Sequence, residues 1–245
     1  MATAAGEAAV SAVLPQLALP GERPSSLQNI FGSWCPKAVV FDCDGLLMDT
    51  ESLWTQTQEI VCAQLGIALD QDLRHRLVGL PASRIGPLMA ECAGAEPATV
   101  IKQLLDVNED LVQKHGRPMR GARELVEAMS AKVPLAVASN SARRILDVAM
   151  AQSTFSRHLA ATVSAEQVAL PKPAPDVYLA AAEALGVSAE ECLAFEDSEA
   201  GAKAAVAAGM KVIAVPQVTS QKPLAHAFCD SLESAELRAW VAAWT

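Results

Sequence analysis

Four short apolar runs are spread along this chain, and each lies next to a segment with helical spacing. The runs cover residues 38–41, 135–138, 192–195 and 212–215, and residues 160–163 form a weaker fifth candidate. Strands that are apolar on both faces and alternate with helices are typical of a parallel sheet covered on both sides. The sequence therefore predicts an α/β fold in which a Rossmann-like parallel sheet lies between two layers of helices.

The spacing of apolar residues predicts helices over about 142–151, 176–185, 200–208 and 235–243. Residues 51–116, between the first and second strands, also show helical periodicity and contain no convincing strand. That segment is much longer than an ordinary connection between two strands. We therefore predict a helical second domain at 51–116, inserted into a core domain made of residues 37–50 and 117–245.

The first 36 residues are rich in proline and contain few large aliphatic side chains before Ile30. This composition predicts a mobile N-terminal tail over 1–36, with one short ordered piece at most. The alanine-rich start lacks the cationic and strongly apolar regions of a secretory peptide, and no apolar run reaches transmembrane length.

The formal net charge of −9 gives the chain no basic surface for nucleic acid or for an anionic membrane. Its six cysteines are scattered, with no C-x-x-C pair and no spacing that would build a zinc site. We therefore expect a reduced, cytoplasmic protein whose partner is a small molecule. The sequence leaves its oligomeric state open.

Polar residues gather where the predicted strands end or in the loops that follow. They are Asp42, Asp44, Ser139, Asn140, Lys172, Glu196 and Asp197. In an open parallel sheet, ligands bind outside the carboxyl ends of the strands, so we expect these side chains to meet there. Together they offer a nucleophile, metal ligands, phosphate donors and a proton donor, which are the groups that phosphoryl transfer requires.

The turn after the first strand has a geometry of its own. Alternation along an extended segment places Asp42 and Asp44 on the same side, and Gly45 allows the backbone to turn away immediately. One carboxylate can then attack a phosphorus atom while the other handles a proton. Cys43 should point away from the site into the core.

Residues 42–51 resemble the first motif of the haloacid dehalogenase-like superfamily, in its subgroup of phosphatases and β-phosphoglucomutases. Residues 137–140, 170–176 and 195–201 resemble the second, third and fourth motifs, in the family's order. The resemblance spans about residues 39–215. It implies the same α/β core with an inserted helical cap domain.

The resemblance also implies a Mg²⁺-dependent enzyme that forms an aspartyl-phosphate on Asp42. Asp44 would act as general acid and base, protonating the leaving oxygen and then activating the water that hydrolyses the intermediate. The implied Mg²⁺ ligands are Asp42, the backbone carbonyl of Asp44, Glu196 and Asp197.

Phosphate oxygens would be held by Ser139, Asn140 and Lys172. Caps in this superfamily close over the substrate, which makes residues at the start of the insertion candidates for substrate choice. We select Glu51, Trp54 and Arg84 as these candidates.

Three functions are compatible with these motifs. The first is a phosphatase of a small phosphorylated metabolite, most simply a sugar phosphate; the second is a β-phosphoglucomutase-like phosphomutase; the third is a binding module without turnover. Where β-phosphoglucomutases carry a histidine and an arginine in the cap, this chain has Trp54 and Ala82. Hydrolysis is therefore favoured, and the intact acidic residues argue against the third reading.

Overall fold

The computed structural model describes residues 17–19, 26–77, 80–217 and 221–244. Its sheet has six strands in the order β3-β2-β1-β4-β5-β6, and every neighbouring pair is parallel. The strands are β1 (Ala38–Phe41), β2 (Leu135–Ser139), β3 (Ala161–Ser164), β4 (Cys192–Glu196), β5 (Lys211–Ala214) and β6 (Ala227–Phe228). The predicted α/β class and parallel sheet are confirmed, and only the short β6 was not anticipated.

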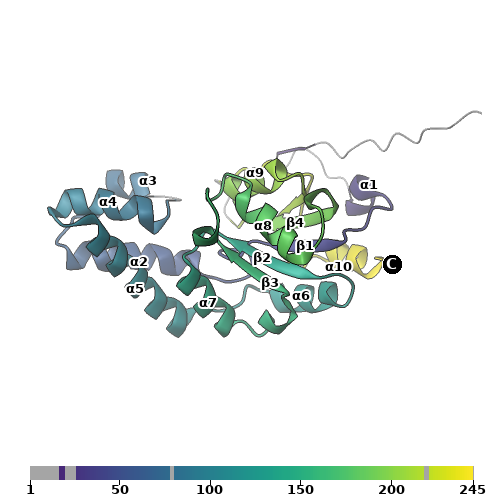
Figure 1. The fold of residues 1–245 in the computed structure, drawn as a ribbon, viewed down its shortest axis with the longest axis horizontal. Coiled ribbons are helices and arrows are strands. Elements are labelled where there is room, and N and C mark those ends of the chain that lie inside the picture. The colour runs from purple at the N-terminus through teal and green to yellow at the C-terminus, as the bar shows by residue number, and fades with distance from the viewer. Residues whose placement is uncertain (1–16, 20–25, 78–79, 218–220, 245) are drawn as a thin grey trace, which may run out of the picture.

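The two faces of the sheet bury different kinds of side chain. Along β1, Val39 and Phe41 enter one hydrophobic cluster, whereas Ala38 and Val40 enter the other. The first cluster holds large residues from α1 (Leu27–Phe31), α6 (Ala122–Ser130), α7 (Arg143–Gln152) and α10 (Ala235–Ala242), and single residues from two further helices. The second is rich in alanine and faces α8 (Asp176–Leu185) and α9 (Glu199–Ala207). Figure 1 shows α8 and α9 on one side of the sheet and α6 and α10 on the other.

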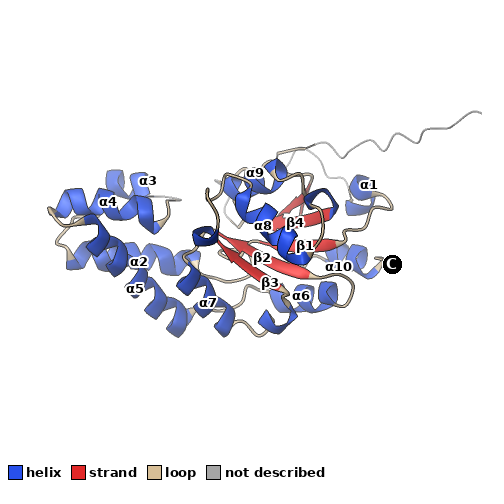
Figure 2. Cartoon of the chain, viewed as in Figure 1, coloured by secondary structure: helices blue, strands red, loops and turns tan. Residues whose placement is uncertain are grey.

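Helices also make up the segment between β1 and α6. They are α2 (Glu51–Gln64), α3 (Gln71–Leu77), α4 (Ala82–Ala93) and α5 (Pro97–His115), and Figure 2 shows them as a separate helical body beside the sheet. Nine buried residues from this segment form a hydrophobic cluster of their own. The fold is therefore a parallel α/β core with an inserted helical cap, while the exact domain limits stay a prediction. Three short 3-10 helices complete the chain, at Ser156–His158, Ala165–Gln167 and Ala189–Glu191.

Two connecting segments, which lie side by side, join the cap to the core. The amide of Asp49 donates to the carbonyl of Arg117, and the amide of Met119 donates to the carbonyl of Leu47. Away from these connections, Arg144 on α7 forms ion pairs with Asp106 and Glu109 on α5. The cap is thus tied to the core both at its root and through a cation on α7.

Part of the segment predicted as a tail belongs to the core. In α1, Leu27 and Phe31 are buried, and the Phe31 ring stacks on Trp240 of α10 with ring centroids 5.1 Å apart. The amide of Leu27 also donates to Glu236, which begins α10. This helix is the short ordered piece that the prediction allowed within 1–36, and the domain boundary at residue 36 stays a prediction. Of the predicted tail, residues 1–16 and 20–25 lie outside the described residues.

Two further sequence expectations concern the chain as a whole. All six cysteines are free thiols, and Cys43 is buried in the cluster on the large-residue face, as its place in the alternation predicts. Among the described residues, no helix is long and apolar enough to cross a bilayer. The cytoplasmic location stays a prediction.

Replacing Phe31 by alanine tests whether α1 is part of the core. We expect Phe31→Ala to lower the free energy of unfolding by about 3 kcal/mol, because it removes a buried ring that stacks on Trp240. Urea unfolding would measure this change beside Asn29→Ala, which alters an exposed residue of the same helix. Equal stability of the two variants would show that α1 is not anchored.

Candidate active site

The predicted site residues lie at the carboxyl ends of three adjacent central strands. Asp42 directly follows β1, Ser139 is the last residue of β2, and Glu196 is the last residue of β4. Because β1 pairs with both β2 and β4, the three ends are neighbours at one edge of the sheet. This is the point where the strand order changes direction, at which open α/β sheets bind their ligands.

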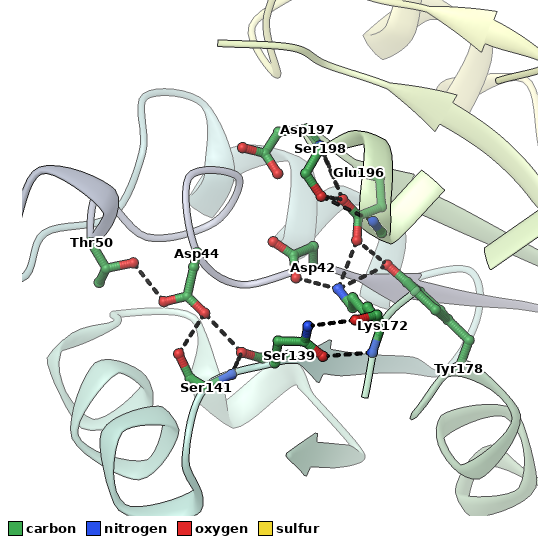
Figure 3. Close-up of polar contacts among 12 residues, drawn as sticks. Asp42, Asp44, Thr50, Ser139, Ser141, Lys172, Tyr178, Glu196, Asp197 and Ser198 are labelled. Carbon is green, nitrogen blue, oxygen red and sulfur yellow. Dashed lines mark hydrogen bonds and ion pairs between the residues drawn. The ribbon is translucent and has the colours of Figure 1, made fainter. Parts of the chain in front are cut away.

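A buried ammonium group lies at the centre of the site. Lys172 Nζ donates to Asp42 Oδ1 at 2.5 Å and to Glu196 Oε1 at 2.7 Å, as Figure 3 shows. The side chains of Lys172, Asp42 and Glu196 are 4%, 9% and 0% exposed, so water screens these pairs weakly.

Acidic groups outnumber cations in this cluster. Asp42, Glu196 and Asp197 each place a carboxylate oxygen within 4.8 Å of the others, and all three residues are buried. Burial raises the pKa of Asp42 to about 8 and that of Asp197 to about 9, with the neighbouring carboxylates adding to the effect. Burial alone would lower the pKa of Lys172, but Asp42 and Glu196 raise it above its ordinary value. The site therefore holds more carboxyl groups than Lys172 can neutralise, and two of them resist ionisation.

This surplus of carboxyl groups gives the cluster the chemistry of a divalent cation site. Mg²⁺ binds carboxylate and carbonyl oxygens and keeps several waters. Asp42 and Asp197 offer such oxygens, so the residues present fit the ion that the family resemblance implies. Glu196 is more heavily engaged, because its two oxygens accept hydrogen bonds from three side chains and two backbone amides.

Asp44 lies apart from the ammonium group, among three hydroxyl groups. Its Oδ1 accepts from Thr50 at 2.7 Å, and its Oδ2 accepts from Ser139 at 2.7 Å and from Ser141 at 2.9 Å. These donors fix the direction of the carboxylate without placing a charge beside it. The Ser139 hydroxyl, expected on a phosphate oxygen, points to Asp44 in this structure (Figure 3).

Asn140 also has a different contact from the one expected. Its side-chain amide donates to the carbonyl of Lys172 at 3.2 Å, and its Oδ1 accepts from the amide of Lys172 at 2.8 Å. This two-way bridge holds the loop that carries Lys172 against the end of β2. The side chain of Asn140 therefore positions the lysine, and that contact occupies the group expected to hold phosphate.

Two glycines permit the close approach of the acidic turns. Gly45 has a φ of 81°, which L side chains rarely adopt, and a Cβ there would lie 2.5 Å from Asp197 Oδ2. A Cβ on Gly201 in α9 would lie 1.7 Å from Glu196 Oε1. Any larger residue at either position would push an acidic side chain out of the cluster.

The three cap candidates differ in their distance from this cluster. Glu51 begins α2, and its Oε2 lies 3.7 Å from the position that a Cβ on Gly45 would take, on the side of Asp197. Trp54 packs, partly buried, against the hydrophobic cluster of the cap. Among the described residues, no hydrogen bond or ion pair joins Trp54 or Arg84 to the acidic cluster. Only Glu51 is thus brought to the site in this arrangement.

Four residues of the site were not singled out from the sequence as site residues. Thr50 and Ser141 supply hydroxyls to Asp44, Ser198 donates to Glu196 Oε2 at 3.0 Å, and Tyr178 donates to Glu196 Oε1 at 2.6 Å. Thr50 and Ser198 lie within motifs recognised in the sequence and Ser141 directly follows one, which is a signal that could have found them. Tyr178 lies within an apolar helix and gives no such signal.

Comparisons with known proteins agree with this geometry. Residues 39–215 match the family described as haloacid dehalogenase-like hydrolase. A Drosophila melanogaster protein named "Probable pseudouridine-5'-phosphatase" is 33% identical over 201 residues, which cover 77% of this chain and 85% of that protein. A Thermotoga maritima protein named "Phosphorylated carbohydrates phosphatase" is 31% identical over 186 residues, covering 72% and 83%.

The fold is also that of a solved relative. The crystal structure of CbbY from Rhodobacter sphaeroides in complex with phosphate superposes with a TM-score of 0.72 at 23% identity, covering 81% of this chain and 95% of that one. Both the predicted family and the predicted enzyme class, a phosphoric monoester hydrolase, are confirmed. On its sequence, its fold and the arrangement of its acidic site, the chain belongs to the haloacid dehalogenase-like hydrolases.

Proposed function

We propose that this protein is a Mg²⁺-dependent phosphatase of a small phosphate monoester whose alcohol part is uncharged, most simply a sugar monophosphate, and that Asp42 becomes phosphorylated during turnover. The observation that carries the proposal is the buried ammonium of Lys172 between Asp42 and Glu196, beside a surplus of carboxylates. Relatives named as phosphatases of phosphorylated carbohydrates and of a phosphorylated nucleoside support the same class of substrate.

Asp42 is placed to act as the nucleophile. It is the first residue after the central strand, its amide donates to the carbonyl of Phe195 at 3.0 Å, and its Oδ1 is held by Lys172. Within the described part of the chain, no hydrogen bond engages Asp42 Oδ2. Attack by a carboxylate oxygen on phosphorus forms the aspartyl-phosphate and releases the alcohol, and Lys172 offsets negative charge on the phosphoryl oxygens.

Asp44 serves as the second carboxylate of the reaction. It lies two residues after the nucleophile in the sequence, and three hydroxyl groups fix the direction of its carboxylate. From there it can give a proton to the leaving oxygen and take one from the attacking water. Such proton transfer contributes typically about 10²- to 10⁴-fold in rate. Ser139 can pass from Asp44 to a phosphate oxygen when substrate enters.

The cation site belongs to the same proposal. Asp42, Asp197 and the backbone carbonyl of Asp44 would hold Mg²⁺, which would offset the charge of the phosphoryl group. The predicted ligand Glu196 lies in the same cluster. Its hydrogen bonds make it the counter-ion of Lys172 as well.

Transfer to water is favoured over return of the phosphoryl group to the sugar. A mutase must hold the second phosphate group of its bisphosphate intermediate while that intermediate reorients in the site. This calls for a cationic or polar contact in the cap. In the described cap, Trp54 and Ala82 stand where those contacts are expected, and both pack against its hydrophobic cluster. The second phosphate would find no donor at these two positions.

The charge at the mouth of the site also limits the substrate. The carboxylate of Glu51 is exposed and near Asp197, whose pKa it helps to raise. A second anionic group on the substrate, next to the ester, would meet this negative charge. A neutral leaving group, such as a sugar or polyol, meets no such repulsion.

Phosphate release tests the proposed activity. A panel of sugar phosphates, polyol phosphates and nucleotides should yield free phosphate with Mg²⁺ and none with EDTA, and Asp42→Asn should lose at least about 10³-fold in kcat because its amide is no nucleophile. Phosphorus NMR of a hexose 1-phosphate separates the alternatives. Accumulation of hexose 6-phosphate without free phosphate would establish the mutase, and full activity of Asp42→Asn or in EDTA would refute the mechanism.

Stability of the metal-free protein tests the crowded carboxylates. Because the pKa of Asp197 is raised from 3.8 to about 9, the unfolded chain releases this proton between pH 3.8 and 9 while the folded chain keeps it, so the fold loses stability as pH rises through that range. Without metal, Asp197→Asn should therefore be more stable than the wild type by about 1–3 kcal/mol at pH 8, and by less at pH 5. Mg²⁺ should stabilise the wild type and not the variant.

Urea unfolding in EDTA and in Mg²⁺, at both pH values, measures this effect. Glu183→Gln on an exposed part of α8 is the matched control, since it removes a carboxylate far from the cluster. A metal-free Asp197→Asn protein that is less stable than the wild type at pH 8 would contradict the account of the charges.

Selectivity tests the role of Glu51. Glu51→Gln should raise kcat/KM for an anionic ester such as a phosphorylated hydroxy acid by about three- to tenfold, because one repulsive charge is removed. Activity toward a neutral sugar phosphate should change less than about twofold. Glu59→Gln, on the same helix, is the control. An equal change for both substrate types in Glu51→Gln would show that Glu51 does not select by charge.

A further inference from the structure

Tyr178 is a fully buried residue of α8 whose hydroxyl reaches the floor of the active site. The hydroxyl donates to Glu196 Oε1 at 2.6 Å and lies 3.3 Å from Lys172 Nζ. The same ammonium lies 4.8 Å from the centre of the tyrosine ring. Packing against the alanine-rich face of the sheet would be served by phenylalanine equally well, so the hydroxyl calls for a separate explanation.

Both oxygens of the Glu196 carboxylate accept more than one hydrogen bond. Oε1 accepts from Lys172 and Tyr178, and Oε2 accepts from the Ser198 hydroxyl and from the amides of Asp197 and Ser198. A carboxylate offers about four lone-pair sites, so these donors use its capacity. The backbone of α9 closes the remaining side at Gly201, where no Cβ would fit. Glu196 can turn only if one of these bonds breaks.

The hydrogen bond from Tyr178 has a particular effect among these five. The three donors on Oε2 belong to the turn that follows Glu196 itself. Tyr178, which donates to Oε1, comes from α8, only six residues after Lys172. It therefore ties the turn after β4 to the element that follows the lysine loop. Without the hydroxyl, Oε1 would have a free lone pair beside Asp197 and the cation site, and Glu196 could turn toward them.

We propose that Tyr178 is a positioning residue whose hydroxyl keeps Glu196 paired with Lys172, so that the ammonium stays on Asp42 and ready for phosphate oxygens. This inference rests on the proposed phosphatase function. Tyr178 acts through Glu196 and does not touch the substrate itself. The network also explains why Glu196, expected as a cation ligand, has its oxygens turned to protein donors.

A double-mutant cycle tests this role without depending on turnover. The four proteins are the wild type, Tyr178→Phe, Glu196→Gln and the double variant, and the probe is inorganic phosphate, titrated by calorimetry in Mg²⁺. We expect Tyr178→Phe to weaken phosphate binding by about five- to tenfold and to lower kcat/KM by a similar factor. In the Glu196→Gln background, the same substitution should change phosphate affinity less than about twofold.

Three controls separate positioning from packing. Ser153→Ala removes another buried hydroxyl, on the carbonyl of Met150 in α7, and should leave phosphate affinity unchanged. Tyr178→Phe should bind Mg²⁺ alone no more weakly than the wild type and show a folded circular dichroism spectrum. Glu196→Asp replaces Glu196→Gln in the cycle if the latter does not fold.

The outcomes are distinct. Additive effects of the two substitutions, or unchanged phosphate affinity in Tyr178→Phe, would overturn the inference. A wild type that binds phosphate with the expected coupling but releases none from any ester would overturn the proposed function and leave the positioning role standing. A wild type that does not bind phosphate in Mg²⁺ would overturn both.

Discussion

The ammonium of Lys172, buried between Asp42 and Glu196, is the interaction on which the rest of the site depends. A buried charge is costly unless it is paired and hydrogen-bonded, and here one cation is shared by two buried carboxylates with a third close by. Removal of the lysine would leave all three acids uncompensated. The surrounding contacts serve this pairing: Asn140 clamps the backbone of Lys172, and Gly201 leaves room for the Glu196 carboxylate.

The parallel sheet makes the pairing possible because it brings the ends of β1, β2 and β4 to one edge. The two faces of the sheet carry side chains of different size. Bulky residues on one face pack against α6, α7 and α10, while the small residues on the other allow α8 and α9 to approach closely. That close approach places Tyr178 and Gly201 against Glu196. The cap is bound to the core by its connecting segments and by Arg144, and its residue Glu51 lies near the acidic cluster, where we propose that it selects among substrates.

The sequence predicted the sheet well because strands buried on both faces must be continuously apolar, and the runs at 38–41 and 192–195 match β1 and β4 to within a residue. The sequence also indicated where the acidic residues gather, because the carboxyl ends of neighbouring parallel strands lie at one edge of the sheet. It could not predict which side chains from distant elements contact one another. The hydroxyl of Ser139 turns to Asp44, and the Asn140 side chain bridges to Lys172. Tyr178 has the helical position of a core residue, and α1 is held by an α10 ring far along the chain.

The central claim is that the strand-end carboxylate of Asp42 receives the phosphoryl group while Lys172 holds it in place. Rapid acid quenching during turnover, followed by digestion and mass spectrometry of the peptide that contains residues 38–48, tests it most directly. The account predicts the added mass of one phosphoryl group on Asp42, absent from Asp42→Asn. A phosphoryl group on another residue, or steady turnover with no phosphorylated protein at any quench time, would contradict it.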